Sequence, residues 1–452
     1  MPKYCVIGGG LSGLEFAVHS AARGNEIVIY DAGPDLRKKH VHFDARVLEG
    51  DEKKVHWTAD ERWAIGGINE RLGGRSLCYH GVMLPIEPSA LESWPAAWQE
   101  RLSGPDGLYR QLQEEFTREF PEMTQRQPIG MPLLHVPQAA VVTESGAFSS
   151  YSPLYHLEPF IRDGMIRIKK ATIAKVENRT HGFRLIDGMG RTVDQESFDK
   201  CVLSASAIIN NRIISTSLGR STTAHVTDHY CIGIAVKTRF GKRVADFRHE
   251  MLWHGFAKQH DLNANIFVVE RPNLDSGDRL LLLMAVMEQN PQLGAFSQLH
   301  CHVGREQSSL EIESHHSDAV IDNYNRLGRQ IVEFACEQLS ADLAPLFDTL
   351  AERSGAFFGS KEVSTLGLAL EGLGSSERSN VYARFAFPYG SYEHESCTHP
   401  IGGTGEIALA DSLEVTALPG VYAVGPGAFP RLGIANPALT ICSLSRWLAS
   451  NI

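Results

Sequence analysis

Residues 4–13 read YCVIGGGLSG, an apolar run of four residues that leads directly into glycines. Such a run, with no polar alternation, is typical of a strand buried in a parallel sheet. The glycines then satisfy the pattern G-x-G-x-x-G at Gly8, Gly10 and Gly13. A strand followed by this glycine turn predicts the start of a dinucleotide-binding βαβ unit.

The next twenty residues complete that unit. Apolar side chains recur at helical spacing over 14–22, Gly24 ends the helix, and residues 26–30 (EIVIY) predict a second strand that ends at Asp31. In such units the three glycines make the tight turn, let backbone approach a pyrophosphate, and let helix and strand pack closely. The acid accepts a hydrogen bond from a ribose hydroxyl. The pattern alone leaves NAD and FAD open as the dinucleotide.

Composition excludes several classes of protein. The 452 residues are 43% hydrophobic, enough for at least one large core, and 43 Lys and Arg against 53 Asp and Glu give a net charge of −10. This balance argues against nucleic acid as a partner. The longest apolar run, 280–287, is too short to span a bilayer. Eight cysteines without a CxxC pair, and no visible secretory signal, favour reduced thiols and a cytoplasmic location.

Four further glycine-rich or proline-containing stretches stand out. Residues 72–81 read LGGRSLCYHG, a composition suited to backbone lying against a planar ligand. Near the C-terminus, residues 399–405 read HPIGGTG, residues 420–430 read GVYAVGPGAFP, and residues 434–440 read IANPALT.

Together with the first unit, these stretches resemble the FAD-dependent glucose-methanol-choline (GMC) oxidoreductase family. The most specific match is His-Pro-x-Gly at 399–402 followed by Asn-Pro-x-x-Thr at 436–440. Asp31 stands where most members have Glu, and the chain is closer to the shorter, pyranose-oxidase-like branch. The matching segments cover roughly 1–35, 63–85, 165–230 and 395–452.

The resemblance implies an α/β fold: a doubly wound, Rossmann-like FAD-binding domain with an inserted α+β substrate (cap) domain. The FAD-binding domain would comprise residues 1–86, 161–229 and 395–452, and the substrate domain residues 87–160 and 230–394.

Several elements are expected inside these segments. By resemblance, residues 171–176, 198–207 and 212–214 would be returning strands of the FAD domain, and Asp228-His229 the family's Asp-His turn. From the residues alone, 87–160 predicts a helix followed by a loop. Elsewhere the pattern predicts strands over 265–270 and 279–287 and an amphipathic helix over 320–339 with Ser317-Asp318 as its N-cap.

The resemblance also implies the residues that hold FAD. They are Gly8, Gly10, Ser12, Gly13, Asp31, Ala32, Gly73, Gly74, Ser76, Ala174, Gly427, Ala428 and Pro437. Cys78 occupies the position nearest to one at which some members of the branch attach FAD covalently. A buried apolar thiol is the alternative interpretation of that residue.

His399 and Asn436 are the candidate catalytic residues. The resemblance places His399 where family members activate the substrate alcohol, and an imidazole can take a hydroxyl proton near neutral pH. Asn436 would hold the substrate oxygen by hydrogen bonding. The alternatives are a structural histidine and a turn-forming asparagine before Pro437. Histidine pairs such as His300 and His302 lack a complete ligand set, so no metal is expected.

The function predicted from these residues is oxidation of an alcohol group on a small or natural-product substrate. Hydride would pass to the flavin, His399 would accept the proton, and oxygen or another electron acceptor would reoxidise the cofactor. Two alternatives remain open: non-oxidative chemistry such as a lyase on the same scaffold, and FAD or nucleotide binding without catalysis. The sequence does not predict an oligomeric state.

Overall fold

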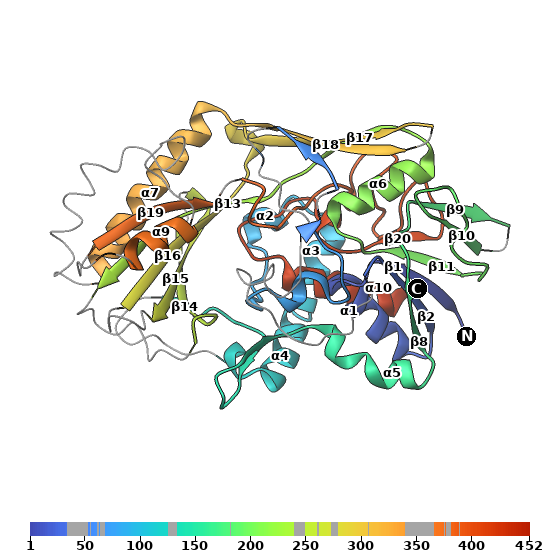
Figure 1. Cartoon of the computed structure of the whole chain (residues 1–452), viewed down its shortest axis with the longest axis horizontal. Helices are drawn as coiled ribbons and strands as arrows, with labels where there is room; N and C mark the ends of the chain where they lie inside the picture. The colour runs from blue at the N-terminus through green and yellow to red at the C-terminus, as the bar shows by residue number, and fades with distance from the viewer. Residues whose placement is uncertain are drawn as a thin grey trace.

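Two large sheets stand at opposite ends of the molecule (Figure 1). A parallel sheet lies at the right of the view and an antiparallel sheet at the left. The computed structural model describes residues 1–33, 53–54, 56–60, 63, 68–124, 133–180, 182–238, 249–259, 262–272, 279–305, 307–339, 366–374, 376, 381–387 and 389–452.

The parallel sheet contains the first residues of the chain. Its strand order is β20-β11-β1-β2-β8, and every neighbouring pair is parallel. The strands are β1 (Lys3–Ile7), β2 (Glu26–Asp31), β8 (Ile166–Lys170), β11 (Lys200–Leu203) and β20 (Val421–Ala423). Strands far apart in sequence thus meet in one sheet, as expected of a doubly wound fold.

Three helices accompany this sheet: α1 (Leu11–Ala21), α6 (Ala207–Leu218) and α10 (Ala438–Asn451). The inner strands β1 and β2 are buried almost throughout, which explains their unbroken apolar sequences. The predicted unit of strand, turn, helix and strand over residues 4–31 is confirmed. The strand expected at Arg212–Ile214 is wrong, because these residues lie inside α6. The strand expected over 171–176 is present only at its end, since residues 171–174 form a loop after β8 and Lys175 begins β9.

The antiparallel sheet has the order β14-β15-β16-β13-β19. Helices α7 (Asp318–Leu339) and α9 (Leu366–Gly374) pack against it. Its strands are β13 (His229–Thr238), β14 (Trp253–Gln259), β15 (Ala264–Pro272), β16 (Arg279–Glu288) and β19 (Val381–Phe387). The predicted strands over 265–270 and 279–287 are confirmed, as is the helix over 320–339. Ser317 accepts a hydrogen bond from the Val320 nitrogen, as an N-cap does.

A third sheet brings together strands from distant segments of the chain. Its order is β12-β17-β18-β4, formed by β12 (Thr222–His225), β17 (Phe296–Val303), β18 (Ser308–His315) and β4 (Thr58–Ala59). In the described part of the chain, three two-stranded sheets lie outside these larger ones, formed by the pairs β3 (Lys53–Lys54) and β5 (Ile68–Asn69), β6 (Ala140–Val142) and β7 (Phe148–Ser150), and β9 (Lys175–Arg179) and β10 (Gly182–Ile186). Short 3-10 helices, labelled η, are η2 (Gly74–Leu77), η3 (Pro121–Met123), η4 (Pro153–His156), η6 (Pro291–Leu293) and η8 (Pro426–Ala428).

Two helices within residues 87–124 pack against the C-terminal helix α10. Trp98 meets Trp447 edge to face at a centroid distance of 4.9 Å, and the hydroxyls of Tyr109 and Thr440 lie 2.8 Å apart. Within residues 87–160, the described α-helices are α2 (Pro88–Leu91), α3 (Ala96–Ser103), α4 (Leu108–Glu119) and α5 (Glu158–Arg162).

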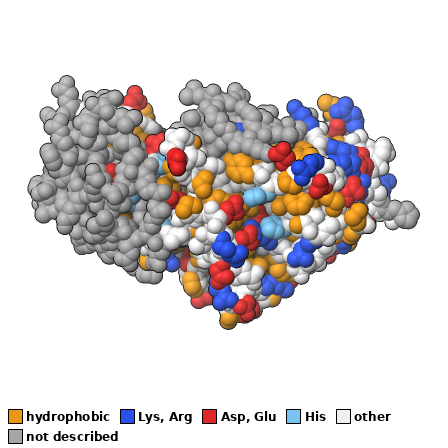
Figure 2. All heavy atoms as spheres, turned by 90° about the horizontal axis from the view of Figure 1, so that it is seen from below, with side chains coloured by type: hydrophobic (Ala, Val, Ile, Leu, Met, Phe, Trp, Pro, Cys, Tyr) orange, Lys and Arg blue, Asp and Glu red, His pale blue; other side chains and the backbone are white. Residues whose placement is uncertain are grey.

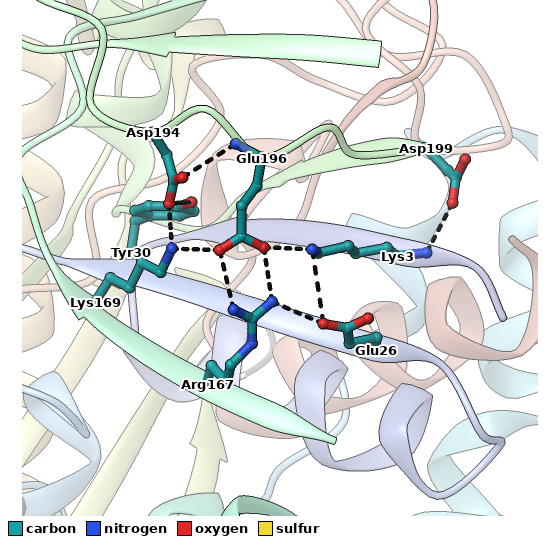
Figure 3. Close-up of polar contacts among 8 residues, drawn as sticks. All are labelled: Lys3, Glu26, Tyr30, Arg167, Lys169, Asp194, Glu196 and Asp199. Carbon is teal, nitrogen blue, oxygen red and sulfur yellow. Dashed lines mark hydrogen bonds and ion pairs between the residues drawn. The ribbon is translucent and has the colours of Figure 1, made fainter. Parts of the chain in front are cut away.

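An ion-pair network links three neighbouring strands of the parallel sheet (Figure 3). Glu196 lies at its centre and pairs with Lys3 of β1 and with Arg167 and Lys169 of β8. Arg167 also pairs with Glu26 of β2 at 2.7 Å. Three parallel strands are therefore tied to the segment that precedes β11.

The described surface is mixed in charge. Figure 2 shows one face, on which basic and acidic side chains are interspersed. Among the described helices, none combines the length and the apolar character that a bilayer crossing demands.

Candidate active site

A cavity of about 530 Å³ lies at the carboxyl ends of β1 and β2, between the parallel and antiparallel sheets. Ligands of open α/β sheets bind at this end of the strands. One wall is backbone-rich and consists of residues 7–12, 30–32, 74–76 and 204–206. The opposite wall comes from the antiparallel sheet and is apolar: Val269 of β15, Leu282 and Met284 of β16, and Phe387 of β19.

The first glycine turn has the geometry of a ligand cradle. Gly8 has φ of +100°, which side-chain-bearing residues rarely adopt, and a Cβ atom placed on Gly13 would lie 2.1 Å from the Gly8 carbonyl oxygen. Both glycines are therefore required for the turn itself. A Cβ placed on Gly10 would meet no atom within 4 Å, and Gly10 lines the cavity. The free space beside Gly10 is where a ligand can approach the start of α1.

Asp31 is fixed next to this turn. Its two carboxylate oxygens accept hydrogen bonds from the backbone nitrogens of Gly9 and Gly33, at 2.7 and 2.9 Å. Burial raises the pKa of Asp31, while these two bonds act in the opposite direction. Each oxygen keeps a further lone pair, so the carboxylate can still accept a hydroxyl at the cavity wall.

The second glycine stretch contacts the first through backbone. The Gly73 nitrogen donates to the Gly9 carbonyl at 2.7 Å, and the Ser76 hydroxyl donates to the Gly73 carbonyl at 2.7 Å. Two glycine-rich segments about sixty residues apart in the chain thus form one side of the cavity.

The predicted cofactor residues divide into two groups. Those that line the cavity are Gly8, Gly10, Ser12, Asp31, Ala32, Gly74, Ser76 and Pro437. Those outside the lining are Gly13, Gly73, Ala174, Gly427 and Ala428. Ala174 follows the lining loop 171–173 directly, and Pro426 lines the cavity next to Gly427.

The two predicted catalytic residues are placed differently. Asn436 lines the cavity, whereas His399 is fully buried outside its lining. The His399 ring lies against Gly427, where an added Cβ would come within 2.1 Å of it. Its Nδ1 lies 2.9 Å from the Thr398 hydroxyl, and burial lowers the pKa of His399 to about 3. Among the described residues, none makes a hydrogen bond with Nε2 of His399.

The loop that leads to Asn436 is fixed from several sides. Glu288, at the end of β16, pairs with Arg431 and accepts the Gly433 nitrogen at 3.0 Å. The Asn265 amide donates to the Ile434 carbonyl at 3.1 Å, and Glu87 accepts the Ile434 nitrogen at 3.0 Å. The position of Asn436 therefore depends on contacts from both the antiparallel sheet and the segment 87–160.

A turn over residues 391–395 forms another part of the wall, and Asp228 organises it. This fully buried carboxylate accepts the backbone nitrogens of Tyr392, Glu393 and His394 at 2.9 to 3.2 Å. Glu393 has φ of +67°, which lets successive N–H groups converge on one anion. Burial, followed by repulsion from Glu395, raises the pKa of Asp228 to about 7.

Arg75 ties this turn to the second glycine stretch. Its guanidinium donates to the Glu393 carbonyl at 2.7 Å and to the Glu395 carboxylate at 2.6 Å. Since the Glu393 and Glu395 side chains are nearly buried, the arginine balances charge that water does not reach.

His394 carries an imidazole at the cavity wall, next to His229. The Nδ1 atoms of the two rings lie 2.8 Å apart, and Nε2 of His229 lies 2.8 Å from the Gly433 carbonyl. Asp228-His229 is recognisable in the sequence as a turn, whereas no motif marks His394. The sequence around His394 shows only an acidic and aromatic stretch, Tyr392-Glu393-His394-Glu395, that follows a strand.

Comparison with known proteins gives the fold. Neither a family profile nor a curated sequence matches this chain. Among the solved structures that match this chain are two aligned over essentially the whole length, each at 12% identity. The first is pyridoxine 4-oxidase from Mesorbium loti, with a TM-score of 0.56. The alignment covers 100% of this chain and 99% of the pyridoxine 4-oxidase chain. The second is a FAD-dependent oxidoreductase from Chaetomium thermophilum, with a TM-score of 0.58. The alignment covers 99% of this chain and 98% of that oxidoreductase chain.

These matches define the class of fold. The chain has the fold of FAD-dependent oxidoreductases, with a Rossmann-like domain and a cap domain. The fold class predicted from the sequence is confirmed.

Proposed function

We propose that this chain is an FAD-dependent oxidoreductase of GMC type that oxidises a CH–OH group on a small or natural-product substrate. The observation that carries the proposal is a single cavity bounded by a glycine turn, by Asn436 and by an apolar wall. When bound, FAD would supply the acceptor for the hydride that leaves the substrate. The full-length likeness to two solved flavoenzymes supports this choice of cofactor.

The residues present fit FAD. The cavity of about 530 Å³ falls within the range of roughly 300–1,000 Å³ found for ligand sites. Gly10 leaves space at the start of α1, where backbone N–H groups and the helix dipole favour a pyrophosphate. Asp31 is positioned to accept a ribose hydroxyl bond. Gly8, Ser12, Ala32, Gly74, Ser76 and Pro437 would line the bound cofactor, with Gly13, Gly73, Ala174, Gly427 and Ala428 behind them.

The apolar wall sets the character of the substrate. Val269 lies opposite Leu282 in register, and Met284 and Phe387 extend the same wall. A substrate with an apolar portion would bury that portion here, while Asn436 donates a hydrogen bond to its alcohol oxygen. The hydroxyl proton must pass to a nearby base, and the motif resemblance assigns that role to His399.

We also propose the domain division expected from the sequence. Residues 1–86, 161–229 and 395–452 would bind FAD, and residues 87–160 and 230–394 would enclose the substrate. The contacts of Trp98 and Tyr109 with α10 would anchor the first insert on the FAD-binding part.

Steady-state oxidation of an alcohol panel tests the proposal. Protein saturated with FAD is mixed with aliphatic, aromatic and sugar alcohols, and with oxygen or a dye as electron acceptor. We expect one class to yield aldehyde or ketone in equal amount to the acceptor reduced. FAD binding with no carbonyl product from any class would contradict the oxidation and favour non-redox use of the site.

A further inference from the structure

We infer that His394, held in place by His229, is the general base that accepts the substrate's hydroxyl proton. The inference rests on the proposed function and assigns one step of it to a residue outside the recognised motifs.

The hydrogen-bond chain determines which nitrogen of each ring carries a proton. A carbonyl oxygen can only accept, so Nε2 of His229, 2.8 Å from the Gly433 carbonyl, must carry a proton. In a neutral ring the other nitrogen is then an acceptor. Nδ1 of His229 therefore accepts, and Nδ1 of His394, 2.8 Å away, must donate. A neutral His394 is left with an unprotonated Nε2.

Both rings are neutral near pH 7. Burial lowers the pKa of His229 to about 4. Burial, followed by the charges of His229 and Arg75, holds the pKa of His394 well below its usual value. Nε2 of His394 is therefore unprotonated before substrate arrives, and the bond between the two Nδ1 atoms can persist when Nε2 takes up a proton.

Other charged groups surround this pair. Asp228 accepts the backbone nitrogens of His229 and His394, and Arg75 pairs with Glu393 and Glu395. These contacts fix the backbone on both sides of His394, and the bond to Nδ1 of His229 orients its ring.

The geometry favours His394 over His399. The Thr398 hydroxyl donates to the Ala207 carbonyl at 2.8 Å, so it must accept from Nδ1 of His399, whose Nε2 is also unprotonated. However, His399 is fully buried against Gly427 and outside the cavity lining, whereas His394 lines the cavity. Two other described histidines line the cavity: His56, which is paired with Glu70 at 2.6 Å, and His80, whose ring packs on Trp253 at a centroid distance of 5.2 Å.

The proposed step balances in atoms and electrons. The substrate O–H bond breaks and its proton goes to Nε2 of His394. The carbinol C–H bond would break with its electron pair, for which FAD would be the hydride acceptor, while the C–O bond becomes C=O. The substrate loses two electrons, and the proton remains on the protein until it is released to solvent.

A first test needs no turnover. Histidine ¹⁵N spectra of the FAD-bound protein near pH 7.5 distinguish the two neutral tautomers, and His394→Asn and His229→Asn assign the signals by their loss. We expect His394 to carry its proton on Nδ1 in the wild type. In a further variant, His229→Leu, no acceptor faces Nδ1 of His394, so His394 should shift toward the Nε2-protonated form. A proton on Nε2 of His394 in the wild type would overturn the inference.

A second test compares rates of anaerobic flavin reduction by an alcohol that the wild type oxidises. We expect His394→Asn and His394→Gln to reduce the flavin about 10²- to 10⁴-fold more slowly with FAD still bound. The matched control is His302→Asn, at an exposed position on β17, which should leave the rate unchanged. His399→Asn tests the competing assignment and should slow reduction less than His394→Asn does.

The results distinguish failure of the proposed function from failure of the assignment of His394 as the base. A wild type reduced by no alcohol would contradict the proposed function, and the base assignment with it. A reducible wild type with an unimpaired His394→Asn would contradict the base assignment alone. A large loss confined to His399→Asn would return the role to the motif histidine.

Discussion

The Oδ2 atom of Asp31 lies 2.7 Å from the backbone nitrogen of Gly9, so the acid that ends β2 is bonded to the turn that follows β1. The same carboxylate accepts the Gly33 nitrogen. The acid at the end of the second strand therefore orders the glycine turn in addition to its proposed bond with a ribose.

Replacement of this carboxylate should weaken FAD binding. In Asp31→Ala, both backbone N–H groups lose their acceptor and the ribose hydroxyl loses its partner. Since a hydrogen bond to a charged group contributes about 1.5–3 kcal/mol, the Kd for FAD should rise by roughly 10- to 100-fold. Fluorescence titration of apoprotein with FAD measures this, and unchanged affinity would contradict the placement of the ribose.

Two glycines of the first turn should respond differently to the same substitution. Gly13→Ala forces a Cβ into the Gly8 carbonyl and the Ser204 hydroxyl, so the free energy of unfolding of the apoprotein should fall by about 1–3 kcal/mol. Gly10→Ala meets open space, so it should leave apoprotein stability nearly unchanged while weakening FAD binding. Urea unfolding and FAD titration of both variants check this. Equal destabilisation by both would show that Gly10 does not face the ligand.

Loss of the Arg75 guanidinium should destabilise the turn over 391–395. Arg75→Met leaves Glu393 and Glu395, whose side chains are only 4% and 5% exposed, without their countercharge. Breaking such a pair costs about 3–5 kcal/mol. Arg75→Lys keeps the charge and should cost less, and Glu395→Gln added to Arg75→Met should recover part of the loss. Urea unfolding of these variants gives the values, and a wild-type-like Arg75→Met would contradict the ion pairs.

Stability should fall as the pH falls below 6.5 because buried histidines must stay neutral in the folded chain. Burial lowers the pKa of His399 from 6.5 to about 3. Between these values the unfolded chain binds a proton that the folded chain does not, which lowers stability by about 1.4 kcal/mol per pH unit. His399→Gln removes this site, so its stability should fall less steeply between pH 6 and 4. Parallel curves for the two proteins would show that His399 is not buried as a neutral ring.

Local patterns were sufficient to predict the first βαβ unit, since its turn is formed by neighbours in sequence. The strand expected at Arg212–Ile214 came from the family resemblance, and an apolar run of this length does not distinguish a strand from a buried helix. The segment lies within α6, in which Ile208, Ile209, Ile213 and Ile214 are all buried. His394 could not be found from the sequence, since its partners Asp228 and His229 are over 160 residues away. Such a site exists only after the antiparallel sheet and the C-terminal loops have come together.

Anaerobic reduction of the bound flavin tests the central claim most directly. The purified protein, saturated with FAD, should show a flavin absorption band at about 450 nm. This band should bleach when one class of alcohol is added and return when an electron acceptor is admitted. That result would establish two-electron transfer from a CH–OH donor to the flavin. A protein that binds no FAD, or whose bound flavin no alcohol bleaches, would contradict the account.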